Sequence, residues 1–389
     1  MKGKLRFFEI TVFIAFAVLS CTQQQQQHKD EDDIRVAPVE GGKSVKITKY
    51  TGSKQVFRIP QRFDEFPITA IGNNAFGNKE LISVTIPNIV TSIGDGAFMN
   101  NLLINVTIGS GVTTIGEKAF QKNQLTSITI PNNATSIGAE AFSENKLTSV
   151  AIPNNVASIG TNAFYENQLT KLTLGNGLNS IGDTAFSTNQ LTSVTIPSNV
   201  TNIGYAPFVF CPALTAIEVS PTNQNYSSVN GVLYDKNVTT LIQWPAGIKD
   251  TVSIPASVIT IGRSAFNGNQ LTGVTIPDSV RVIERYAFGN NQLSSIIIPD
   301  SVRTIDKYAF YENQLTSVVI GNGVNFIGDY AFDKNKLTRI TIGDGVDLED
   351  NWQSDAFDRN FVYLYLRNNK RAGTYTRPNN NSSNWTRQP

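Results

Sequence analysis

The sequence predicts a repeat solenoid that consists mainly of β-structure, and three observations carry this prediction. A phrase close to Asn-Gln-Leu-Thr-Ser-Val-Thr-Ile-Pro returns along the chain and is followed by Ile-Gly-x-x-Ala-Phe. The closing phenylalanine recurs every 22 residues in two runs, and a fixed period of this length indicates stacked coils. The apolar residues inside each unit alternate as they do in a strand. The phenylalanines are Phe76, Phe98, Phe120, Phe142, Phe164, Phe186 and Phe208, then Phe266, Phe288, Phe310 and Phe332, with Phe357 closing a looser unit.

The first 21 residues are predicted to be a secretory signal peptide. A basic start precedes an apolar stretch from Ile10 to Leu19, which is too short to span a bilayer as a helix. The stretch ends in Val-Leu-Ser followed by Cys21, which resembles the cleavage box of bacterial lipoproteins. That resemblance implies that Cys21 becomes the acylated N-terminus of the mature chain. Ordinary secretion with an incidental cysteine is the alternative.

The next two segments are expected to connect the anchor to the repeats. Residues 22–33 contain a glutamine run and acidic residues without periodic apolar positions, which predicts a disordered tether. Residues 34–75 are expected to cap the first coil, because a bare parallel edge recruits other chains.

The repeats are predicted to occupy residues 76–208 and 256–366. In one unit, Ile128 and Ile130 alternate with a threonine, and a proline ends the strand that this pattern predicts. The return segment is too short for an ordinary helix. We therefore expect a curved stack with a parallel sheet on one face and short turns or extended segments on the other.

An asparagine stands two residues before the leucine of most units. We expect its amide to bond the backbone of adjacent coils, while a binding role for the column is the alternative. The column consists of Asn123, Asn145, Asn167, Asn189, Asn269, Asn291, Asn313 and Asn335.

Two segments are expected to depart from the repeat. Residues 209–255 contain Asn230-Gly231 between short apolar segments, which predicts a hairpin within an island. The island either completes the stack or protrudes as a contact site. Residues 367–389 are expected to cap the C-terminal end of the stack.

The strand segment follows the pattern L-x-x-V-x-I of the leucine-rich repeat, and the period lies in that repeat's range. With I-G-x-x-A-F and the inserted phrase Asn230-Gly-Val-Leu-Tyr-Asp-Lys, the chain resembles the BspA-like leucine-rich repeat proteins of treponemes and Bacteroidetes. The resemblance extends over roughly residues 45–389. It implies a surface-displayed lipoprotein that acts in adhesion, although a fold alone does not fix an activity.

Composition argues against several classes of function. Removing residues 1–21 takes away three basic residues and one acidic residue, which changes the formal net charge from +1 to −1. A nucleic-acid partner needs a basic face, so none is expected. The single histidine, His28, lies in the tether, so the folded part offers no Ser-His or Cys-His pair. Cys211 is expected to fill the core. We predict neither catalytic residues nor a cofactor or metal site.

Two columns of side chains are candidates for a binding surface. On the strands of the last coils, Ser and Thr give way to Ile297, Val319, Arg339, Tyr363 and Tyr365. Coils stack about 4.8 Å apart, so these residues are predicted to form one patch, unless the C-terminal cap folds over them.

The second column lies just before each Ala-Phe pair and contains Tyr286, Tyr308 and Tyr330 at 22-residue steps. The three rings either support each other or form a platform for a sugar or a protein.

The sequence therefore predicts a binding protein of the bacterial cell envelope. It is expected to be attached by its lipid alone, to the outer membrane, and displayed outward. The predicted partners are a host extracellular matrix protein or another cell-surface protein or glycan. The alternatives are a carbohydrate-active enzyme or glycan-binding module, and a passive surface coat protein.

Overall fold

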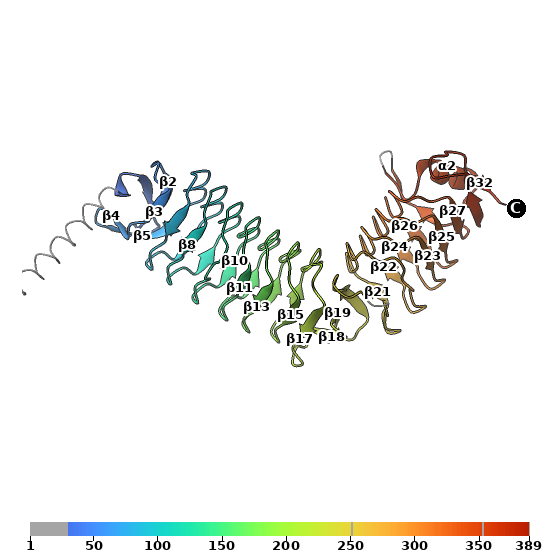
Figure 1. The fold of residues 1–389 in the computed structure, drawn as a ribbon, viewed down its shortest axis with the longest axis horizontal. Helices are drawn as coiled ribbons and strands as arrows, with labels where there is room; N and C mark the ends of the chain where they lie inside the picture. The colour runs from blue at the N-terminus through green and yellow to red at the C-terminus, as the bar shows by residue number, and fades with distance from the viewer. Residues whose placement is uncertain (1–29, 250–251, 352–353, 389) are drawn as a thin grey trace, which may run out of the picture. The chain divides into compact units, whose positions relative to one another are not determined.

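The predicted fold class is confirmed, because the chain folds as stacked coils of short, mostly parallel strands (Figure 1). The coils belong to two compact units, one up to residue 147 and the other from residue 148 onward. The predicted signal peptide and Cys21 lie outside the described residues. The computed structural model describes residues 30–249, 252–351 and 354–388.

The N-terminal unit begins with a cap in which β1 pairs with β2 in antiparallel fashion, and β2 continues in parallel to β5. Asp30 is buried, and its carboxylate lies 2.6 Å from the Lys54 amine, which also lies 2.7 Å from Asp33. Ordered structure therefore begins by residue 30, within the segment predicted as tether. The cap strands are β1 (Ile34–Pro38), β2 (Val45–Tyr50), β3 (Val56–Arg58), β4 (Arg62–Phe63) and β5 (Phe66–Ile71).

Each coil contributes to two columns of parallel strands. The first column contains the predicted Ser-Val-Thr strands, and in the N-terminal unit it consists of β6 (Ser83–Thr85) and β8 (Asn105–Thr107), with the cap strand β3 paired in parallel to β6. The second column forms from the short return segments, and its members in that unit are β7 (Ser92–Ile93), β9 (Thr114–Ile115) and β10 (Ser136–Ile137). Partners in either column are 22 residues apart, so side chains of one kind stack on one another.

The C-terminal unit repeats both columns. The first contains β11 (Ser149–Ala151), β13 (Lys171–Thr173), β15 (Ser193–Ile196), β17 (Ala216–Val219), β23 (Ser295–Ile298), β25 (Ser317–Ile320) and β27 (Arg339–Ile342). The second contains β12 (Ser158–Ile159), β14 (Ser180–Ile181), β16 (Asn202–Ile203), β21 (Thr260–Ile261), β22 (Val282–Ile283), β24 (Thr304–Ile305), β26 (Phe326–Ile327) and β28 (Asp347–Leu348). The face predicted to hold short turns or extended segments therefore carries extended segments, and these pair into a sheet of their own.

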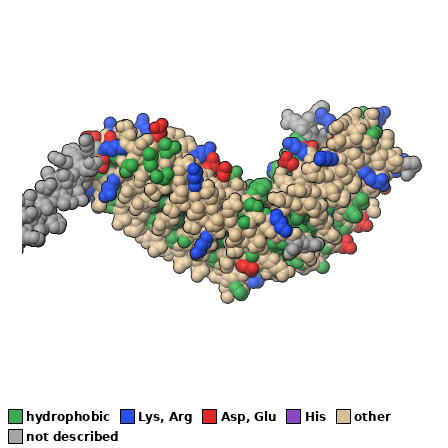
Figure 2. Space-filling view, viewed as in Figure 1, with side chains coloured by type: hydrophobic (Ala, Val, Ile, Leu, Met, Phe, Trp, Pro, Cys, Tyr) green, Lys and Arg blue, Asp and Glu red, His purple; other side chains and the backbone are tan. Residues whose placement is uncertain are grey.

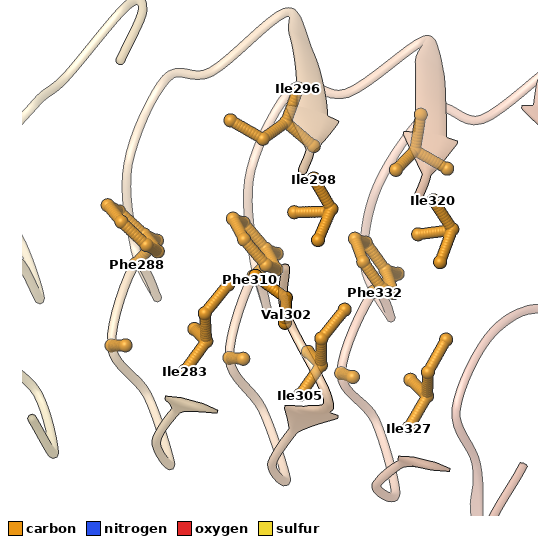
Figure 3. Close-up of a cluster of buried hydrophobic side chains, with 14 of the residues drawn as sticks. Ile283, Phe288, Ile296, Ile298, Val302, Ile305, Phe310, Ile320, Ile327 and Phe332 are labelled. Carbon is orange, nitrogen blue, oxygen red and sulfur yellow. The ribbon is translucent and has the colours of Figure 1, made fainter. Parts of the chain in front are cut away.

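Stacked phenylalanines form the centre of the core (Figure 3). The ring centroids of Phe288 and Phe310 are 5.1 Å apart, and those of Phe310 and Phe332 are 5.0 Å apart. Isoleucines from both strand columns, such as Ile298 and Ile305, fill the space around the rings. Because each ring packs against the same ring of the next coil, the packing enforces a constant coil length.

The asparagine column bonds adjacent coils as predicted. The Asn313 amide donates to the carbonyl oxygens of Phe288 at 2.9 Å and Phe310 at 3.1 Å, and its oxygen accepts from the Leu293 N–H. Cys211 takes the place of the asparagine in its own coil, where its thiol lies 3.5 Å from the Phe186 carbonyl oxygen. Cys211 is buried, as expected of a core residue.

The island contains an antiparallel hairpin, β18 (Tyr226–Val229) and β19 (Val232–Asp235), with Asn230 and Gly231 at its turn. Strand β20 (Thr240–Gln243) follows and pairs in parallel with β21, so the island extends the second column. Tyr234 and Leu241 are fully buried, which supports the interpretation of the island as part of the stack.

The C-terminal cap closes the edge of the first strand column. Strand β31 (Gly373–Thr376) pairs with β27 in antiparallel fashion, and β32 (Thr386–Arg387) pairs with β31. A helix, α2 (Arg359–Arg367), precedes them, so the cap begins before residue 367. A small hairpin between β29 (Asp350–Asn351) and β30 (Ser354–Asp355) leads into the helix.

Candidate binding surface

The three tyrosines of the second predicted column occupy a left-handed turn of the backbone. Their φ angles are 57° at Tyr286, 60° at Tyr308 and 57° at Tyr330. Steric contact between Cβ and the backbone disfavours this conformation for large side chains. The equivalent positions of other coils, which are also left-handed, hold Asn74, Gly96, Lys118, Glu140, Asn162, Thr184, Ala206 and Ser264.

The tyrosine rings stack into a ladder along the coils. The ring centroids of Tyr286 and Tyr308 are 4.7 Å apart, those of Tyr308 and Tyr330 are 4.9 Å apart, and both pairs are nearly parallel. Tyr311 meets the ladder edge-on, 5.4 Å from Tyr308. Both faces of the Tyr308 ring are therefore covered by other rings. The ladder presents ring edges and hydroxyl groups, and its central ring has no open face on which a sugar could stack.

Charged groups flank the tyrosine ladder. The Arg285 guanidinium lies 5.4 Å from the Tyr286 ring and 5.3 Å from the Tyr308 ring, within the range of cation–π attraction. The Lys307 amine lies 2.7 Å from Glu349 and 3.1 Å from Asp329. These hydrogen bonds raise the pKa of Lys307, and burial raises the pKa of Tyr308 above its ordinary value. The Tyr308 hydroxyl therefore stays protonated at neutral pH and can donate a hydrogen bond.

The predicted strand patch is present in part. Ile297 on β23 and Val319 on β25 are register neighbours, with 69% and 40% of their surfaces exposed. Arg339 is also exposed, but it is paired in register with Ser317, and the register neighbour of Val319 on β27 is Thr341. The cap strand β31 borders this sheet at β27 and leaves Ile297 and Val319 uncovered. In the view of Figure 2, most of the visible surface is neither hydrophobic nor charged.

The prediction for Tyr363 and Tyr365 is wrong, because both lie in α2 and not on a strand. Tyr365 is fully buried, and its hydroxyl donates to the Gly343 carbonyl oxygen at 2.7 Å. Tyr363 is 66% exposed on the helix. The apolar residues Phe361, Val362 and Tyr365 follow a helical spacing that turns one face of α2 toward the core.

A second exposed apolar group, in the N-terminal unit, was missed by the sequence prediction. Leu102 and Ile104 expose 47% and 46% of their surfaces just before β8. Later coils place glutamine or lysine at the first position and threonine or serine at the second. Comparing each coil with the repeat consensus would have revealed both substitutions.

The described residues offer little for chemistry. They contain no cluster of three or more histidine, cysteine, aspartate or glutamate side chains placed to hold a metal ion. Burial raises the pKa of Cys211 to about 12, so its thiol is a poor nucleophile at neutral pH. Within the same part of the chain, no helix has the length and hydrophobicity needed to cross a membrane.

Comparison with known proteins agrees with this architecture. The profile of the BspA-type leucine-rich repeat region matches residues 69–146, 135–241 and 248–361. The chain belongs to this family. Repeat proteins of this kind are typically binding modules without enzymatic activity. None of the curated proteins matches the chain significantly.

Two solved structures share the fold of this BspA-type protein. The pneumococcal vaccine antigen PcpA is 22% identical over 87% of this chain and 95% of its own, with a TM-score of 0.58. A leucine-rich cell-surface protein from Faecalibacterium prausnitzii A2-165 is 25% identical over 78% of this chain and 90% of its own, with a TM-score of 0.57.

Proposed function

We propose that this BspA-type protein is displayed on the bacterial cell surface, anchored to the outer membrane by acyl chains on Cys21. There it binds a host matrix protein or the surface of another cell. The observation that carries the binding role is the tyrosine ladder in its left-handed backbone positions. The cell-surface location of the Faecalibacterium relative supports surface display.

The energetics of the ladder favour a role outside the fold. A left-handed conformation costs about 1–2 kcal/mol for a residue other than glycine. A stacked aromatic pair contributes about 0.5–1.5 kcal/mol beyond area burial. The three strained tyrosines together cost about 3–6 kcal/mol, whereas their two stacked pairs return only about 1–3 kcal/mol, so stacking of Tyr286, Tyr308 and Tyr330 does not offset the backbone strain. Asparagine, which other coils use at this position, tolerates the conformation better.

The chemistry of the ladder favours a protein partner over a glycan. Tyrosine and arginine are enriched at the centres of protein interfaces, and Arg285 lies against the rings. A glycan that stacks on aromatic faces finds the Tyr308 ring covered on both sides.

Replacing the three tyrosines by asparagine tests the binding role. The triple variant should stay folded and lose at least tenfold in binding to plates coated with solubilised extracellular matrix or to intact bacterial cells. Thr184→Asn with Ser264→Asn changes the same backbone position in other coils and should leave binding unchanged. Equal binding by both variants would refute the ladder as the contact surface. Absence of binding by the unaltered chain would favour a passive coat protein.

The anchor needs a separate test. Mass spectrometry of the mature N-terminus should show acylation of Cys21, and Cys21→Ser should release the protein from the cell. Protease added to intact cells should digest the lipidated protein if the repeats face outward. Protection from the protease would contradict surface display.

A further inference from the structure

Four apolar side chains form a patch on the N-terminal cap and the first coils, where β3, β6 and β8 pair in sequence. Val56 is 68% exposed on β3, while Leu102 and Ile104 are about half exposed before β8. Ile82 is half-buried. It lies between the strands that carry Val56 and Ile104, because the Ile104 N–H donates to the Ile82 carbonyl oxygen and the Ile82 N–H donates to the Gln55 carbonyl oxygen. These four residues are called the N-terminal apolar patch below.

The patch breaks the repeat consensus at two positions. All the equivalents of Leu102 in later regular coils are polar: Gln124, Lys146, Gln168, Gln190, Gln270, Gln292, Gln314 and Lys336. Ile82 and Ile104 stand where those coils carry Thr126, Thr148, Thr170, Thr192, Thr272, Ser294, Thr316 and Thr338. The fold of a coil therefore does not require apolar residues at these positions.

The patch lies at the end of the chain that carries the proposed anchor. The Asp30 carboxylate contacts the Lys54 amine at 2.6 Å, and Lys54 is two residues from Val56. Nine residue steps separate Cys21 from Asp30, and a fully extended chain of that length spans at most about 32 Å. An acylated Cys21 therefore keeps the patch close to the bilayer.

We propose that the N-terminal apolar patch docks on the lipid surface into which Cys21 is inserted. This inference rests on the proposed lipid anchor. The tether gives the patch a high effective concentration at the membrane, so a small apolar contact suffices to hold it there. The first coils then lie against the bilayer.

Fluorescence quenching tests the contact in the lipidated chain. Asn105→Cys, beside Ile104, carries an NBD fluorophore, and Ser193→Cys carries it at the equivalent position of a later coil; both sites are exposed. The labelled proteins are inserted into phosphatidylethanolamine–phosphatidylglycerol vesicles that contain nitroxide lipid. Quenching at residue 105 should exceed that at residue 193 at least threefold. Combining Ile82→Thr, Leu102→Gln and Ile104→Thr should remove the difference, and Ile297→Thr with Val319→Thr should preserve it.

The outcomes separate the patch from the anchor. Equal quenching at the two sites, or quenching that survives the triple substitution, refutes lipid docking while an acylated Cys21 still supports the anchor. An unacylated Cys21 in the mass spectrum refutes both. If Cys21→Ser protein is a dimer in solution and the triple substitution makes it monomeric, the patch contacts a second copy and the lipid assignment is wrong.

Discussion

At the scale of single residues, one asparagine in most coils supplies hydrogen-bond partners to backbone groups that have none at the bend of the coil. The Asn313 side chain donates to the carbonyl oxygens of Phe288 and Phe310 and accepts from the Leu293 N–H, all inside the core. Asn335 makes the equivalent bonds to Phe310, Phe332 and Leu315 but is half-buried. The two sites thus differ in burial and not in bonding.

This difference predicts unequal costs of substitution. Asn313→Ala leaves buried backbone groups without partners and should lower the free energy of unfolding by roughly 3–5 kcal/mol. Asn335→Ala should cost only about 1 kcal/mol, because water reaches the groups that it leaves behind. Urea unfolding followed by circular dichroism measures both values. Equal losses would show that burial does not determine how much each asparagine of the column contributes to the free energy of unfolding.

Three buried groups predict a loss of stability at high pH. Burial raises the pKa of Cys211, Tyr234 and Tyr365 to about 12, from ordinary values of 9.0, 10.0 and 10.0. The folded chain therefore keeps protons that the unfolded chain releases. The free energy of unfolding therefore keeps its full value below pH 9, where both states hold these protons, and it falls as the pH rises toward 12. Each group should contribute a slope of about −1.4 kcal/mol per pH unit once its unfolded form ionises.

Urea unfolding at several pH values between 8 and 11.5 measures this slope. Tyr234→Phe removes one ionisable group. Above pH 10, the free energy of unfolding of this variant should therefore fall less steeply with pH, by the contribution of Tyr234. A stability that does not change with pH in this range would contradict the burial of these groups in the folded state.

At the scale of elements, the repeats were predictable and the helix of the C-terminal cap was not. Ile296 and Ile298 alternate with exposed residues, and the same alternation in neighbouring coils identified the strands. The segment around Tyr363 also contains alternating large residues, which suggested another strand. The signals for a helix were the Asp358 N-cap and the spacing of Phe361 and Tyr365, but they occur once and have no repeat to reinforce them.

Asp358 connects the helix to the rest of the cap, which predicts graded effects of substitution. Its side chain accepts from the Asn360 N–H at 2.9 Å and lies 3.1 Å from the Arg377 guanidinium. Arg377 is buried, so removing its partner leaves an unpaired charge inside the cap. Asp358→Ala should destabilise the cap by about 3 kcal/mol, from the lost N-cap and the unpaired charge together.

Asp358→Asn provides the matched control, because asparagine is also a good N-cap. It should cost about 1 kcal/mol less than Asp358→Ala. Hydrogen exchange of the α2 amides measures the difference. Identical exchange in the two variants would show that the N-cap contributes nothing.

On the candidate surfaces too, features that repeat along the sequence could be predicted and features that occur once could not. The ladder of Tyr286, Tyr308 and Tyr330 could be predicted, because a column at constant spacing must stack in a solenoid. The sequence left open whether the rings support each other or offer their faces to a ligand, since this depends on side-chain angles. Leu102 and Ile104 are ordinary hydrophobic residues by type, and only their departure from the consensus marks them.

At the scale of the whole molecule, stability is expected to follow from nearest-neighbour stacking, since each coil contacts the coils on either side of it. Deleting residues 289–310 joins Phe288 to Tyr311 and makes Phe332 the new neighbour of Phe288. The variant loses one coil but keeps both strand columns and the phenylalanine stack in register. It should therefore fold, with an unchanged shape of its far-ultraviolet circular dichroism spectrum and a modestly lower unfolding midpoint.

Deleting half a coil provides the contrasting case. Removing residues 289–299 shifts the two columns against each other, so that strands face turns and apolar side chains point to solvent. This variant should aggregate or unfold, although it lacks fewer residues than the first. Thermal melts and size-exclusion chromatography of both deletions test the idea. If the 11-residue deletion were as stable as the 22-residue deletion, the register between coils could not be what holds the stack together.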